Sequence, residues 1–125
     1  GVPGRRGPMA DQGVGRIDGV CWFFPGLKFV MRHGAEPWEA LAVKLMIKWP
    51  NLYYSTSAFA PKYYPQAIID YANSRGGDKI IYAGYFPAGL TYERIFSELP
   101  NVGFNDDVWP RFLRTNAERI LGLNA

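Results

Sequence analysis

The sequence alternates short apolar runs, rich in β-branched and aromatic residues, with longer amphipathic segments. The apolar runs are LKFVMR at Leu27 to Arg32, NLYYSTS at Asn51 to Ser57 and DKIIYAG at Asp78 to Gly84. Such runs are typical of strands that are buried on both faces. They start about 24 and 27 residues apart, which is the repeat of right-handed βαβ units with parallel neighbouring strands. The alternation therefore predicts an α/β fold.

The amphipathic segments between these runs predict the helices. In PWEALAVKLMIKW, over residues 37–49, the apolar side chains recur at helical spacing and Pro50 ends the pattern. Similar patterns predict helices over 17–24 and 65–75. Two further helices are expected to begin at Thr91 and Asp107, whose side chains can cap a helix N-terminus, and the last is expected to end at Gly122.

Three parallel strands need neighbours at both edges and cover on both faces. A (β/α)8 barrel of about 250 residues would supply both. We therefore predict that residues 1–125 form the C-terminal part, about three βα units, of a single TIM-barrel domain with the helices on one side of the strands. We expect this part alone to be inactive. A small free-standing doubly wound sheet is the alternative.

Composition and charge narrow the function. The chain is 48% hydrophobic and has a net charge of +3 that is spread along the sequence, which argues against disorder and against a nucleic-acid partner. No apolar run reaches the roughly 18 residues of a membrane helix, and Cys21 is the only cysteine, as in reduced compartments. We expect a cytoplasmic protein that binds a small-molecule substrate, with no membrane partner. A homo-oligomer of the full-length form is left open.

Candidate site residues follow the first predicted strand, because ligands bind beyond the carboxyl ends of parallel strands. Arg32 and His33 end this run, and Glu36 and Trp38 follow as candidate substrate-binding residues. His33, the only histidine, suits a general base, a metal ligand or a donor to an oxyanion, although a single histidine is more often structural. Arg32 suits a substrate carboxylate, or else a buried ion pair with Glu36 or with a neighbouring loop.

The other two strand ends carry hydroxyl groups. Ser55 and Ser57 are predicted to orient a substrate, with polar filling of a barrel mouth as the alternative. Tyr85 follows the third strand, where parallel-sheet enzymes often place a charged residue. A phenol there can donate a hydrogen bond or a proton.

Three stretches together resemble the C-terminal part of the amidohydrolase-related family of TIM-barrel enzymes, which includes aminocarboxymuconate semialdehyde decarboxylase. FPGLKFVMRHGAEPWEALA resembles the segment around the sixth strand of the family, and WPNLYYSTSAF resembles its seventh strand. DVWPRFLRTNAERILGL resembles its closing helix. The matches lie in the family's order and span most of the chain.

The resemblance implies a hydrolase or decarboxylase that acts on a small organic substrate. It also implies a divalent metal, usually zinc, held by histidines from earlier strands and by an Asp at the end of the eighth strand. His33 matches the histidine that acts beside this metal on substrate and water. Tyr85 stands where the family has its Asp, and a neutral phenol cannot replace that charge, so no metal ligand is assigned in this chain. We therefore predict that Tyr85 points into the mouth of the barrel close to His33, with its hydroxyl donating a hydrogen bond to substrate or to the imidazole.

Two functional hypotheses follow. The first is an amidohydrolase-type enzyme that uses acid–base chemistry at His33 and Tyr85. The second is a barrel that is catalytically impaired and binds a ligand or partner without metal chemistry.

Overall fold

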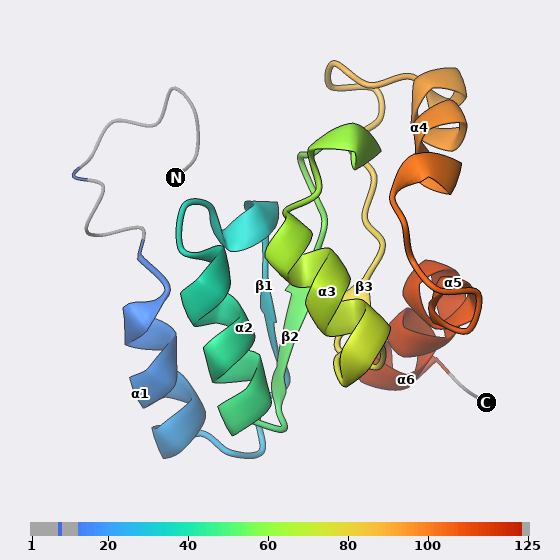
Figure 1. The fold of residues 1–125 in the computed structure, drawn as a ribbon. Helices are drawn as coiled ribbons and strands as arrows, with labels where there is room; N and C mark the ends of the chain where they lie inside the picture. The colour runs from blue at the N-terminus through green and yellow to red at the C-terminus, as the bar shows by residue number, and fades with distance from the viewer. Residues whose placement is uncertain (1–7, 9–12, 124–125) are drawn as a thin grey trace.

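The computed structural model describes residues 8 and 13–123 and has an α/β architecture (Figure 1). Its helices and strands follow one another in the order α1 (Gly15–Phe23), β1 (Phe29–Met31), η2 (His33–Ala35), α2 (Glu39–Lys48), β2 (Leu52–Ser55), η3 (Pro61–Tyr63), α3 (Gln66–Ser74), β3 (Ile80–Ile81), α4 (Tyr92–Glu98), η4 (Leu99–Asn101), α5 (Val108–Pro110), the π-helical η5 (Arg111–Thr115) and α6 (Asn116–Leu121).

The three described strands form one sheet in the order β1-β2-β3, and both pairs are parallel. This confirms the predicted α/β class and the parallel neighbours, and it is the arrangement expected for an arc of a barrel. The strands are shorter than the sequence predicted. β1 stops before the turn at His33, and beyond β3 the amide of Tyr82 donates to the carbonyl of Phe112 rather than to a strand.

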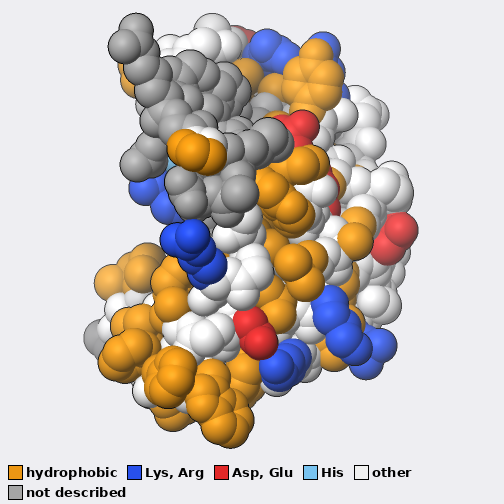
Figure 2. Space-filling model, turned by 90° about the vertical axis from the view of Figure 1, so that its left-hand side faces the viewer, with side chains coloured by type: hydrophobic (Ala, Val, Ile, Leu, Met, Phe, Trp, Pro, Cys, Tyr) orange, Lys and Arg blue, Asp and Glu red, His pale blue; other side chains and the backbone are white. Residues whose placement is uncertain are grey.

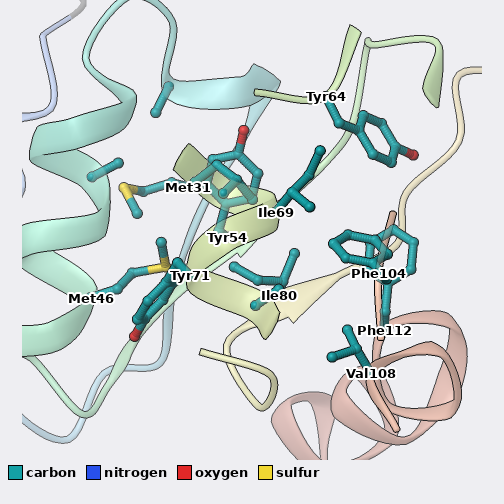
Figure 3. Packing of buried hydrophobic residues seen from close by; sticks show 14 of the residues in the cluster. Met31, Met46, Tyr54, Tyr64, Ile69, Tyr71, Ile80, Phe104, Val108 and Phe112 are labelled. Carbon is teal, nitrogen blue, oxygen red and sulfur yellow. The ribbon is translucent and has the colours of Figure 1, made fainter. Parts of the chain in front are cut away.

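The main core lies between the sheet and the helices α1, α2 and α3, which run along one of its faces (Figure 1). Because side chains alternate along a strand, Tyr54 points into this core while its neighbour Tyr53 points away from it. Figure 3 shows Tyr54 packed among Met31 and Ile69. The core is therefore built from large apolar side chains between two layers.

A smaller cluster covers part of the opposite face of the sheet. Tyr53 and Ile81 pack there against Ile120, and Ala117 lies beside them. Ile120 and Ala117 belong to α6, so the C-terminal helix covers part of the face of the sheet that lies opposite α2 and α3. The amino end of β1 is tied to the same helix, because Nζ of Lys28 donates to the carbonyl of Ile120 at 3.0 Å.

The predicted ends of the C-terminal helices have mixed outcomes. Oγ1 of Thr91 accepts from the amide of Arg94 at 3.2 Å, so the predicted cap is confirmed. Gly122 ends α6 with a φ of 69°, also as predicted. The prediction that Asp107 caps its helix is wrong. Asp107 already has helical backbone angles, and its carboxylate binds the guanidinium of Arg111.

None of the described helices is long and apolar enough to cross a membrane. The surface nevertheless carries aromatic side chains at the C-terminal end of α1. Figure 2 looks onto the side where α1 lies and shows hydrophobic side chains gathered in its lower part. The exposed residues of this end are Trp22, Phe23, Phe24 and Leu27.

Candidate active site

The residues that follow β1 form a left-handed turn. His33, Gly34 and Ala35 have φ angles of 57°, 73° and 56°. Only glycine adopts this region without strain, and a side chain there costs about 1–2 kcal/mol per residue. The turn therefore places strain at His33 and Ala35 that the surrounding structure must offset.

One backbone group of each residue in this turn makes a hydrogen bond to a residue outside the turn. These hydrogen bonds offset the strain. The His33 amide donates to Oγ of Ser57 (3.2 Å), the Gly34 carbonyl accepts from the hydroxyl of Tyr54 (2.8 Å), and the Ala35 carbonyl accepts from the amide of Trp38 (2.7 Å).

The ring of His33 meets the ring of Tyr85 edge to face. Their centroids lie 6.1 Å apart and the ring planes cross at 82°. The two residues follow different strands, β1 and β3, so the sheet brings them together at its carboxyl end. The predicted closeness of Tyr85 to His33 is confirmed, and Tyr85 remains 39% exposed.

Nδ1 of His33 is buried and has no hydrogen-bond partner in the part of the chain that the structure describes. The hydroxyl of Tyr85 therefore does not donate to this nitrogen, which was one of the expected roles for it. A buried polar atom without a partner costs about 1–3 kcal/mol. Such atoms are rare in folded proteins and often mark a site that serves function rather than stability.

The hydroxyl residues after β2 connect the three strand ends. Ser55, Thr56 and Ser57 are all buried. Oγ1 of Thr56 accepts from the amide of Ala83 at 3.3 Å, and Oγ of Ser55 accepts from the amide of Ser57 at 3.4 Å. Oγ of Ser57 also accepts from the amide of His33. These side chains therefore stabilise the backbone at the strand ends, whether or not they contact a substrate.

The charged candidates lie at the surface. Arg32 and Glu36 are both exposed, so the alternative of a buried partner for Arg32 is not borne out. Trp38 is partly buried and packs against the main core. Of the predicted substrate-binding residues, Arg32 and Glu36 are therefore the ones that face solvent beside His33.

The buried Tyr64 hydrogen-bonds with Thr56, and the partly buried Tyr82 follows β3. Burial raises the pKa of Tyr64 to about 12, although a hydrogen bond with Thr56 acts in the opposite direction. Burial also raises the pKa of Tyr82. Both phenols are therefore neutral hydrogen-bonding groups at neutral pH.

The sequence analysis missed Tyr54 and the left-handed turn. The alternation of side chains along the second apolar run could have placed Tyr54 on the helix-covered face. Nothing in the local sequence indicates that its hydroxyl reaches the carbonyl of Gly34, because Tyr54 lies on β2 and Gly34 lies in the turn that follows β1.

The donor set does not fit a divalent metal. His33 is the only histidine of the chain, and within residues 13–123 no three His, Cys, Asp or Glu side chains lie together in a way that could hold an ion. Tyr85 adds a neutral phenol where the resemblance implies a carboxylate. The residues described can therefore supply acid–base groups, but they do not supply a metal centre.

A family model described as amidohydrolase matches residues 17–123, which include β1, β2, β3 and both ring residues of the site. No curated protein and no solved structure matches the chain.

Proposed function

Because the chain belongs to the amidohydrolase family, we propose that it takes part in the hydrolysis or decarboxylation of a small organic substrate, with His33 and Tyr85 as its acid–base residues. The observation that supports this most directly is the meeting of these two rings beyond the carboxyl ends of β1 and β3. Ligands of parallel α/β proteins bind at this end of the sheet.

His33 is the proton-transfer group of the proposal. In a hydrolysis, a base takes a proton from the water that attacks the carbonyl carbon. In a decarboxylation, an acid gives a proton to the carbon from which carbon dioxide leaves. An imidazole serves either reaction near neutral pH, and Nδ1 of His33 is not occupied by any described residue.

Tyr85 is proposed as a donor rather than as a base. A tyrosine hydroxyl is a hydrogen-bond donor, so the hydroxyl of Tyr85 can donate to an oxygen of the substrate while the ring stays against His33. Its partial exposure leaves the hydroxyl within reach of a bound molecule.

Substrate binding is assigned to the residues around this pair. The guanidinium of Arg32 can hold a substrate carboxylate through two parallel hydrogen bonds. We propose Glu36 and Trp38 on the same segment, and Ser55 and Ser57 at the end of β2, as further contacts to the substrate. A substrate with a carboxylate fits this charge pattern best, and it fits both reactions.

The test compares His33→Gln, Tyr85→Phe and the control Tyr63→Phe in the natural-length protein that carries these residues, because Tyr63 is an exposed tyrosine on η3. Activity is screened on small carboxylic acids, amides and esters. We expect His33→Gln to lower kcat/KM about 100-fold or more and Tyr85→Phe to lower it about tenfold. Release of carbon dioxide identifies a decarboxylase, and release of an amine or alcohol identifies a hydrolase.

The second candidate function is binding without turnover, which Tyr85 at the position of the family's Asp favours. Under this alternative the natural-length protein turns over none of the compounds, yet a carboxylate ligand binds and Arg32→Met weakens its binding. Full activity of His33→Gln on a substrate that the wild type converts would contradict the assignment of His33.

A further inference from the structure

We propose that Tyr54 is a positioning residue for His33, because its buried hydroxyl holds the carbonyl of Gly34 and so fixes the turn that brings the imidazole to Tyr85. The inference rests on the proposed function of His33. It adds a residue that touches neither substrate nor the reacting atoms.

The first argument is the place of Tyr54 in the sheet. It lies on β2 opposite Met31 of β1 and is completely buried. Figure 3 shows its ring between the sheet and the helices, with the hydroxyl pointing toward the turn that follows β1. A buried tyrosine hydroxyl needs a hydrogen-bond partner, and here that partner is the carbonyl of Gly34 at 2.8 Å.

The second argument is the fit of Gly34 against an aromatic ring. A Cβ atom at Gly34 would lie 2.4 Å from Cε2 of Phe59, closer than two such atoms can approach. The turn is thus confined by the ring of Phe59 as well as held by the hydroxyl of Tyr54. To move, the turn would have to lose its hydrogen bond to Tyr54 and pass the ring of Phe59.

The third argument concerns which peptide units are fixed. Oγ of Ser57 holds the amide that precedes the Cα atom of His33, and Tyr54 holds the carbonyl that follows the Cα atom of Gly34. With both ends of this two-residue segment bound, the backbone angles of His33 are determined, and with them the direction of its Cβ atom. Loss of the Tyr54 bond frees one end of the segment.

The variant Tyr54→Phe separates this role from simple packing, since it keeps the ring in the core and removes only the hydroxyl. The matched control is Tyr71→Phe, because Tyr71 is also a buried tyrosine of the same core but lies on α3. Both residues are buried tyrosines of the main core, and only Tyr54→Phe removes a hydrogen bond to the turn at His33.

The experiment records the imidazole signals of His33 by NMR in the natural-length protein, assigned by their loss in His33→Gln. In wild type we expect cross-relaxation between the ring protons of His33 and Tyr85. Tyr54→Phe should reduce this cross-relaxation by half or more and broaden the His33 signals, while Tyr71→Phe leaves both unchanged. In the activity assay, Tyr54→Phe should lower kcat about tenfold to a hundredfold and leave KM within about twofold.

The activity assay and the NMR measurement test the proposed function and the positioning role separately. If His33→Gln keeps full activity, the proposed function is wrong, yet the imidazole signals still test the role of Tyr54. If Tyr54→Phe is folded and its His33 signals match those of wild type, the positioning role is wrong. If Tyr54→Phe does not fold, the wild-type protein provides the test. The inference requires that the hydroxyl proton of Tyr54 is protected from exchange with solvent and shows a through-bond coupling to the carbonyl carbon of Gly34. Free exchange of this proton would contradict the inference.

Discussion

The two ends of the sheet differ in how their polar groups are satisfied. At the amino end, Nζ of Lys79 donates to the carbonyls of Trp49 at 2.9 Å, Pro50 at 2.8 Å and Leu52 at 3.1 Å. At the carboxyl end, Nδ1 of His33 is buried and has no partner among the described residues. The amino end therefore has carbonyls that share a charged donor, whereas the carboxyl end has a buried ring nitrogen without a partner among the described residues.

The backbone shows the same difference. Beside the amino end of β3, Nδ2 of the buried Asn116 donates to the carbonyls of Gly77 and Ile80 at 2.7 and 2.9 Å. At the carboxyl end, the turn over His33, Gly34 and Ala35 is left-handed throughout. Strain and unpaired polar atoms are common at functional sites, and they persist only where other contacts offset them. The comparison thus assigns stability to the amino end and chemistry to the carboxyl end.

The largest expected effect is at the amino end. Asn116→Ala removes a buried amide and leaves two buried carbonyls without their donor. We expect a loss of about 3 kcal/mol in the free energy of unfolding, measured by urea denaturation. The control Asn101→Ala removes an exposed amide with one long bond to Ser97 and should cost less than about 0.5 kcal/mol. Equal losses for the two variants would break the comparison.

Lys79→Met should have a smaller effect at the same end of the sheet. Methionine keeps the apolar stem of Lys79 but leaves three carbonyls without their charged donor. Burial lowers the pKa of Lys79, so removal of the charge also relieves a desolvation cost. We expect a net loss of about 2 kcal/mol in the free energy of unfolding. Lys44→Met, at an exposed position of α2, should leave the unfolding midpoint unchanged.

A third prediction concerns stability at high pH. Burial raises the pKa of Tyr64 to about 12 in the folded protein, against about 10 in the unfolded chain. Its contribution to stability is therefore complete below pH 10 and is lost as the pH rises toward 12. Between pH 10 and 11, Tyr64 should account for about 1 kcal/mol of lost stability.

The check is the difference in pH dependence between wild type and Tyr64→Phe, followed by urea unfolding at several pH values. This difference cancels the contribution of Lys79, whose lowered pKa makes stability rise with pH over the same alkaline range. Parallel stability curves for the two proteins above pH 10 would mean that Tyr64 ionises as easily when folded as when unfolded.

The sequence predicted those parts of the fold that local patterns determine. Apolar runs and helical spacing were enough for the parallel sheet, and the rule for strand ends together with the family resemblance was enough to bring His33 and Tyr85 together. The left-handed turn could not be predicted, because His33 and Ala35 disfavour a positive φ. It exists through contacts with Tyr54 and Ser57, which lie on the next strand and just after it.

Errors in the sequence prediction have the same origin. Asp107 has the residue type of a helix cap, but its carboxylate is taken by Arg111, which lies on the following turn. The packing of α6 against Tyr53 and Ile81 is likewise a long-range contact. The spacing of apolar residues within the strands or within α6 does not predict it. Residue type and spacing predict the elements, and competition among partners decides the side-chain contacts.

The smallest expected effect is at the turn itself, and it tests whether Ala35 is strained. Ala35 has a φ of 56° and is buried, so Ala35→Gly relieves about 1–2 kcal/mol of backbone strain. It also loses a buried methyl group and makes the unfolded chain more flexible, which together cost about as much. We therefore expect the free energy of unfolding to stay within about 0.5 kcal/mol of wild type.

The control Ala42→Gly, at a fully buried position of α2, has no strain to relieve and should lose about 1–2 kcal/mol. If both variants lose the same free energy, Ala35 is not strained, and the contrast between a relaxed amino end and a strained carboxyl end does not hold.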